Sequence, residues 1–176
     1  MTKRSAGLLV YRGHTHGRQS DLEVFLVHPG GPFWAKKDHG AWSIPKGEYE
    51  EDEPPLEAAL REFHEETGFT VTGDFPGEFL DLGVIRQAGG KLVTAWACAG
   101  DFDPAYLVSN ECEIEWPPHT GRRIQIPEVD RGAWFPIPEA RIRIFASQHE
   151  FLDRLLARLL AKLGADKPSP APPSAA

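Results

Sequence analysis

The stretch that decides the fold runs from Gly47 to Phe69 and reads GEYEEDEPPLEAALREFHEETGF. Nine acidic residues and one base, Arg61, fall between Gly47 and Glu66, so this segment carries a charge of −8 in a chain that carries −7. The rest of the chain therefore has a net charge of +1, and the negative charge is local. Carboxylates three or four positions apart on a helix repel each other, so their concentration here calls for a physical reason.

Helical periodicity places the acidic and the apolar residues of this segment on different faces. At roughly 100° per residue, Glu62, Glu65 and Glu66 fall within an arc of about 100°. An apolar stripe that can pack on a core lies about a right angle away and consists of Leu56, Ala59, Leu60 and Phe63. A divalent cation would turn the repulsion among the carboxylates into attraction, and their hard oxygens suit Mg²⁺ or Mn²⁺.

The ends of this helix are also predicted by the sequence. The pair Pro54-Pro55 suits a first helical turn, where the missing N–H groups cost nothing. Asp52 or Glu53 is then expected at the N-cap, although glutamate is a poor cap. Gly68 follows the last apolar position and fits a left-handed residue just past the helix end. Gly47 allows close approach of the backbone, so its carbonyl is available to a cation.

The spacing of these residues resembles the signature of the Nudix hydrolases. That signature reads Gly, five residues, Glu, seven residues, Arg-Glu, an apolar residue, any residue, Glu-Glu, any residue, Gly and an apolar residue. Every position is filled here, by Gly47, Glu53, Arg61-Glu62, Phe63, Glu65-Glu66, Gly68 and Phe69. Seven fixed positions at a usage of ~6–7% each give a chance match on the order of 10⁻⁸ per window. The resemblance implies an α/β fold, the Nudix α/β/α sandwich with a mixed sheet.

The resemblance also assigns roles to the signature residues. It implies that Mg²⁺ or Mn²⁺ is held by three side chains and one backbone carbonyl, those of Glu62, Glu65, Glu66 and Gly47. Arg61 is expected to orient this site through an ion pair with a signature carboxylate such as Glu53. Two alternatives compete with this interpretation: an acidic face that is merely solvated, and a nucleotide-binding module that does not catalyse.

Nudix hydrolases often take a further carboxylate, as base or as ligand, from a loop well downstream. In this chain Glu128, within the run IPEVD, is the best candidate, and Asp130 and Glu113 are weaker ones. The base that accepts a proton from water is then Glu65, Glu66 or Glu128, and the sequence does not choose among them.

Substrate phosphates also require cations. The candidates are Lys46, Lys91, Arg122 and Arg123, and the alternative for each is a solvated surface position. Four tryptophans are able to stack on a nucleobase, although such residues more often belong to a core; they are Trp34, Trp42, Trp96 and Trp116.

Length and composition bound the class of protein. The 176 residues predict one domain over residues 1–163 and a disordered, Pro/Ala-rich tail over residues 164–176. No run approaches 18 apolar residues, so no segment is expected to cross a membrane. The net charge of −7 argues against a nucleic-acid partner. The two cysteines, Cys98 and Cys112, are expected to be reduced thiols of a cytoplasmic protein.

Hydrophobic patterning predicts the remaining elements. Strands are expected at residues 6–11, 22–27, 42–44, 79–86, 91–99 and 133–136, with a hairpin turn around residues 88–90. Asp101–Pro118 is expected to be irregular. A second helix is predicted from a capping box of Ser147 and Glu150 to an end at Gly164.

These observations predict a Mg²⁺- or Mn²⁺-dependent enzyme that acts on a small nucleotide. Its reaction is the hydrolysis of a phosphoanhydride in a nucleoside diphosphate-linked compound. The order of motifs resembles that of small dinucleoside polyphosphate hydrolases, which favours a dinucleoside polyphosphate as the substrate. A (d)NTP pyrophosphohydrolase is the main alternative, followed by enzymes acting on diphosphoinositol phosphates or nucleotide sugars. The oligomeric state is left open.

Overall fold

A computed structural model of the chain describes residues 3–13, 21–71 and 78–165. Its main sheet is built from β1 (Arg4–Gly13), β2 (Leu22–Pro29), β3 (Lys46–Glu48), β4 (Leu80–Arg86), β5 (Leu92–Ala99) and β8 (Val129–Pro136). Within the described ranges these six strands follow the order β4-β5-β1-β2-β8, with β3 paired to β1 beside this path. β1 and β5 are parallel and the other pairs are antiparallel, so the sheet is mixed.

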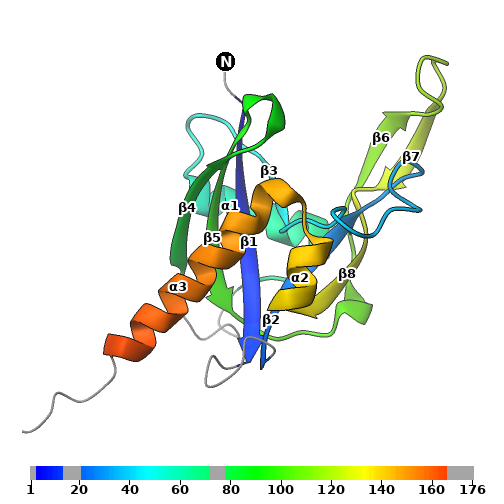
Figure 1. Ribbon diagram of the computed structural model, residues 1–176. Coiled ribbons are helices and arrows are strands. Elements are labelled where there is room, and N and C mark those ends of the chain that lie inside the picture. The colour runs from blue at the N-terminus through cyan, green and yellow to red at the C-terminus, as the bar shows by residue number, and fades with distance from the viewer. Residues whose placement is uncertain (1–2, 14–20, 72–77, 166–176) are drawn as a thin grey trace, which may run out of the picture.

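Helices cover both faces of this sheet. Successive side chains of a strand point to opposite faces: in β1, Leu8 packs with Phe63 of α1 (Pro55–Thr67), whereas Leu9 packs with Phe151 of α3 (His149–Ala165). The short α2 (Ile137–Arg143) lies on the same face as α3, and α1 lies behind the sheet (Figure 1). The predicted α/β/α sandwich with a mixed sheet is confirmed.

Four of the predicted strands, β1, β2, β4 and β5, agree with the structure to within two residues at each end, and the β4–β5 turn contains the expected glycines. β8 begins earlier than predicted, at Val129. The strand predicted at residues 42–44 is wrong: Trp42 and Ser43 form only isolated bridges, and β3 follows at Lys46–Glu48. Backbone pairing with β1 makes this short polar segment a strand. The pairing begins with a hydrogen bond of 3.0 Å from the Leu8 N–H to the Pro45 carbonyl.

The predicted end of α1 is confirmed and Pro55 begins its first turn as expected, but the predicted N-cap is wrong. Gly68 has a φ of 76° and its N–H donates to the His64 carbonyl, as expected of a left-handed C-cap. Pro54 occupies the N-cap without any side-chain hydrogen bond, so neither Asp52 nor Glu53 caps the helix. Glu53 is instead hydrogen bonded to Arg61.

The C-terminal helix exists as predicted, but its capping box does not. Ser147 lies inside a preceding 3₁₀ turn, η4 (Ala146–Gln148), and Glu150 pairs with Arg154. The helix continues through Gly164 to Ala165, and the rest of the predicted tail lies outside the described residues. α2 was not predicted, because seven residues are too few for a helical period to be recognised. In the described parts of the chain, no helix has the length and apolar character needed to cross a membrane.

A second, two-stranded sheet projects from the body of the molecule (Figure 1). It consists of β6 (Glu111–Glu115) and β7 (Arg123–Pro127), so the expectation that Asp101–Pro118 is irregular is wrong for its second half. The run ECEIE alternates exposed glutamates with half-buried Cys112 and Ile114. This period of two was the available signal for a strand.

Candidate active site

The acidic face of α1 packs on β3, and Gly47 permits the contact. A side-chain carbon at Gly47 would overlap the carboxylate of Glu62. The φ of Gly47 is not in the left-handed region, so space and not backbone conformation requires glycine here. Glu62 is only 8% exposed. Burial raises its pKa and the charges of Glu65 and Glu128 act in the same direction, while Arg61 opposes them.

Arg61 joins three carboxylates of the signature. Its Nε and Nη2 donate to the two carboxylate oxygens of Glu53 at 2.8 and 3.0 Å, which is a bidentate pair. Its Nη1 donates to Glu62 at 2.7 Å and to Glu65 at 3.2 Å. These hydrogen bonds, led by the one to Glu53, raise the pKa of Arg61. The predicted pair between Arg61 and Glu53 is confirmed.

Glu66 is held by the backbone of β3. Its Oε2 accepts a hydrogen bond from the Lys46 N–H at 3.0 Å. Burial raises the pKa of Glu66 to about 8, and the charges of Glu62 and Glu128 contribute to the rise, whereas Lys46 opposes it. A carboxyl group with a pKa near neutrality is typical of a general base or acid.

Glu128 joins this group from the connection between β7 and β8. Its N–H donates to the Asn110 carbonyl and its carbonyl accepts from the Gly30 N–H, both at 2.9 Å, so its backbone is fixed on two sides. Burial, followed by the charge of Glu65, raises the pKa of Glu128. The structure therefore brings the downstream carboxylate close to the acidic face of α1. We call Glu62, Glu65, Glu66 and Glu128 the acidic cluster.

The acidic cluster fits a hard divalent cation by its chemistry. Carboxylates and a backbone carbonyl supply only oxygen ligands, which Mg²⁺ and Mn²⁺ prefer, and a cation would offset their mutual repulsion. Among the described residues, no three His, Cys, Asp or Glu side chains already converge as a formed metal site. Arg61 binds one oxygen each of Glu62 and Glu65, and Glu66 binds a backbone N–H. Arg61 thus leaves the second oxygen of Glu62 and of Glu65 for a cation.

Two of the predicted phosphate-binding cations lie beside β3. Burial lowers the pKa of Lys46 and the ammonium of Lys91 acts in the same direction, while Glu66 opposes them. The Nζ of Lys91 donates to Glu48 at 3.0 Å. The alternation of β3 turns Gly47 toward α1 and Lys46 toward the other side of the sheet, where its Cβ lies against Gly7. β3 thus carries carboxylate contacts on one side and ammonium groups on the other.

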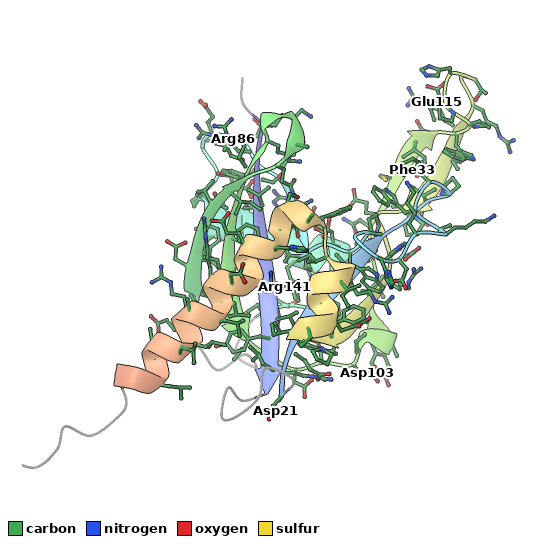
Figure 2. All side chains as sticks on the ribbon, in the orientation of Figure 1. Asp21, Phe33, Arg86, Asp103, Glu115 and Arg141 are labelled. Carbon is green, nitrogen blue, oxygen red and sulfur yellow. The ribbon has the colours of Figure 1, made fainter. Side chains whose placement is uncertain are left out.

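The other predicted cations, Arg122 and Arg123, are not brought to the acidic cluster. Arg123 pairs in register with Glu115, which Figure 2 shows at the far end of the projecting hairpin. The Nη1 of Arg123 donates to Glu113 at 2.7 Å, which also takes Glu113 out of the predicted site. The sequence expectation fails because only the Pro127 end of the hairpin meets the body of the molecule.

Contacts and burial show where the remaining candidate residues lie. Asp130 lies 2.9 Å from Nδ1 of the buried His28 and has a structural partner there. Trp42 is 4% exposed and belongs to the core. Trp96 packs against the core on the α1 side, and Trp116 precedes the turn of the β6–β7 hairpin. Trp34 is half-buried and lies beside Lys46 at a cavity.

Gln148 is a positioning residue that sequence reasoning missed. It is fully buried; its Oε1 accepts from the Ile44 N–H at 3.0 Å and its Nε2 donates to Ser43 Oγ at 3.0 Å. The side chain thereby ties η4 to the segment that leads into β3. A single glutamine next to a helix gives no sequence signal for such a contact, because the partners are about a hundred residues away.

Comparison with known families agrees with this geometry. A family model described as the NUDIX domain matches residues 1–155. The chain belongs to the NUDIX family. The matched range includes β3, α1 and Glu128, and the resemblance recognised from the signature is confirmed.

Two relatives indicate the range of activities found among similar NUDIX proteins. An 8-oxo-(d)GTP phosphatase of Mycolicibacterium smegmatis is 29% identical over 167 residues, which cover 89% of this chain and 42% of the relative. An RNA pyrophosphohydrolase of Rhizobium meliloti is 29% identical over 109 residues, which cover 56% of this chain and 60% of the relative. The chain thus spans less than two thirds of the length of either protein.

Solved structures share the fold. The C. elegans Ap4A hydrolase in a binary complex has a TM-score of 0.59 at 20% identity, covering 89% of this chain and 98% of that one. The NUDIX domain of Shewanella oneidensis NrtR, solved with ADP ribose, has a TM-score of 0.57 at 19% identity, covering 90% and 89%. At these identities the likeness establishes the architecture alone.

Proposed function

We propose that this NUDIX protein is a Mg²⁺- or Mn²⁺-dependent hydrolase of a phosphoanhydride bond in a nucleoside diphosphate-linked compound. The observation that carries the proposal is the acidic cluster, in which Arg61 binds Glu62 and Glu65 while the backbone N–H of Lys46 binds Glu66. The names of the two relatives, a phosphatase and a pyrophosphohydrolase, support it.

In this proposal the signature residues bind the cation, and Arg61 orients two of them, Glu62 and Glu65. Glu62, Glu65, Glu66 and the Gly47 carbonyl are its ligands. When bound, the cation lowers the pKa of water and neutralises charge on the departing phosphate. Arg61 keeps Glu62 and Glu65 on one side of α1, because it is itself anchored on Glu53. Lys46 and Lys91 bind the substrate phosphates.

One carboxylate accepts the proton of the attacking water. The candidates are Glu65, Glu66 and Glu128. Glu128 is the one of the three that the proposal does not also assign as a ligand of the cation, and burial raises the pKa of its carboxyl group, which favours it as a proton acceptor.

Two substrate classes are compatible with this chemistry. The order of motifs favours a dinucleoside polyphosphate. The relative that covers 89% of the chain is named for 8-oxo-(d)GTP, which favours a (d)NTP as the second candidate. We also propose that the protein acts in the cytoplasm, in line with its two free thiols.

A panel of dinucleoside polyphosphates and (d)NTPs, incubated with Mg²⁺ in ¹⁸O-labelled water, tests the proposal. We expect two products from each cleaved molecule, one of which carries a single ¹⁸O from water, and mass spectrometry shows which product is labelled and therefore which phosphorus was attacked. Binding without any product would support the non-catalytic alternative and would overturn the proposal.

A further inference from the structure

A cavity of about 250 Å³ lies on the side of β3 that faces away from the acidic cluster. Four separate segments supply its lining, which consists of Trp34, Lys46, Gln87, Ala88, Phe145 and Ser147. The rings of Trp34 and Phe145 meet edge to face, with centroids 5.4 Å apart and an interplanar angle of 72°. Both rings are half-buried, so part of each faces outward.

We propose that this cavity, between Trp34 and Phe145, binds the nucleobase of the substrate, while the phosphates extend across β3 to the acidic cluster. This inference rests on the proposed function for the phosphate end and adds the site that recognises the other end of the same molecule.

The size and chemistry of the lining favour a single aromatic ring system. Pockets for drug-sized ligands typically measure about 300–1,000 Å³, so this cavity suits a base better than a whole nucleotide. Aromatic side chains bind bases by stacking without depending on the sequence of a nucleic acid. The Gln87 amide carries both a donor and an acceptor, and its Nε2 lies 3.4 Å from Ser147 Oγ. These polar groups match the mixed donors and acceptors on the edge of a base.

The position of Lys46 connects the cavity with the acidic cluster. Its side chain lines the cavity, whereas its backbone N–H donates to Glu66 on the opposite side of β3. The strand contains only three residues. A ligand whose base lies beside Trp34 therefore has its phosphates at the same strand that holds a proposed metal ligand.

The cavity wall is fixed to β3 before any ligand arrives. The Phe145 N–H donates to the Trp42 carbonyl at 2.8 Å, and Gln148 binds the Ile44 N–H. Both contacts join the wall to the segment that runs into Lys46. A preformed wall lowers the entropy cost of binding.

The test measures the binding of AMP and of ribose 5-phosphate, which lacks the base, by titration calorimetry without added metal. For the wild type we expect AMP to bind on the order of 10-fold more tightly than ribose 5-phosphate, as expected for one stacked base. Trp34→Ala should remove this ratio and leave the affinity for ribose 5-phosphate unchanged. Trp34→Phe, which retains an aromatic ring, should preserve most of the ratio. Trp116→Ala is the matched control and should behave like the wild type.

An unchanged ratio in Trp34→Ala, or a wild type that does not prefer AMP, would overturn the assignment of the cavity. Turnover is measured separately on the same proteins. Hydrolysis in which Trp34→Ala leaves the KM unchanged would overturn the cavity and leave the proposed function intact. A Trp34-dependent preference for AMP in a protein without turnover would support the assignment of the cavity and overturn the proposed function.

Discussion

The two sides of β3 differ in how their chemistry is encoded. On the side of α1, all but one of the proposed functional groups come from the single segment Gly47–Phe69, and Glu128 is the exception. On the other side, the cavity is assembled from a loop after β2, the β4–β5 turn, β3 and the segment between α2 and α3. The difference teaches that the proposed chemical step depends on local spacing, whereas the proposed recognition of a base depends on tertiary contacts.

The largest effect on activity should come from a substitution in the acidic cluster. Glu66→Gln keeps the shape of the side chain but removes its charge and basicity, so we expect kcat to fall by about 10²–10⁴-fold. Steady-state hydrolysis with Mg²⁺ measures it. Glu57→Gln, on an exposed position of the same helix, is the control. Full activity in Glu66→Gln would contradict the assignment of Glu66 as ligand or base.

Gly47→Ala tests whether activity depends on the contact between β3 and α1. The added carbon would displace the Glu62 carboxylate, and a misplacement of about 1 Å can lower a rate by roughly 10²-fold. Because the backbone conformation of Gly47 tolerates alanine, the fold should persist, as circular dichroism would show. Gly164→Ala, where nothing lies within 4 Å of the added carbon, should retain activity. Equal activity in both variants would mean that activity does not depend on the observed position of the Glu62 carboxylate.

Lys46→Met addresses the residue shared by both sides. The ammonium is lost while the aliphatic stem against Gly7 is kept, so we expect KM to rise on the order of 10-fold, as for the loss of one charged hydrogen bond. Initial rates at varied substrate concentrations separate KM from kcat. The exposed Lys36→Met serves as the control. A KM that stays the same would remove Lys46 from substrate binding.

The smallest effects concern stability, on the two faces of β1. Ala6 is fully buried against Ala58 and Ala59 of α1. Ala6→Ser should therefore lower the free energy of unfolding by about 1–3 kcal/mol, because it buries a hydroxyl. Ser5 faces the other side, and its buried hydroxyl has no hydrogen-bond partner among the described residues. Ser5→Ala should therefore be neutral or stabilising by up to about 1 kcal/mol. Urea denaturation measures both free energies of unfolding, and a destabilised Ser5→Ala would reveal a partner for that hydroxyl.

The same contrast explains what the sequence could predict. The apolar periodicity and Gly68 were sufficient for α1 and its C-cap, because these features are local, whereas the pair between Arg61 and Glu53 was implied by the resemblance to the Nudix signature. Glu128 was found through its position in a known pattern. Arg123 was misplaced because nothing local reveals that the hairpin projects. The contacts of Gln148 could not be predicted, since only the folded sheet brings it to Ile44.

The bond from Gln148 to Ile44 also orders events during synthesis of the protein. A ribosome releases α1 and β3 early, but the segment that closes the cavity emerges only after most of the domain has been made. A nascent chain therefore contains Lys46 and Lys91 well before the segment that completes the proposed base site. In our proposal, recognition of a base depends on one of the last segments of the domain to be synthesised.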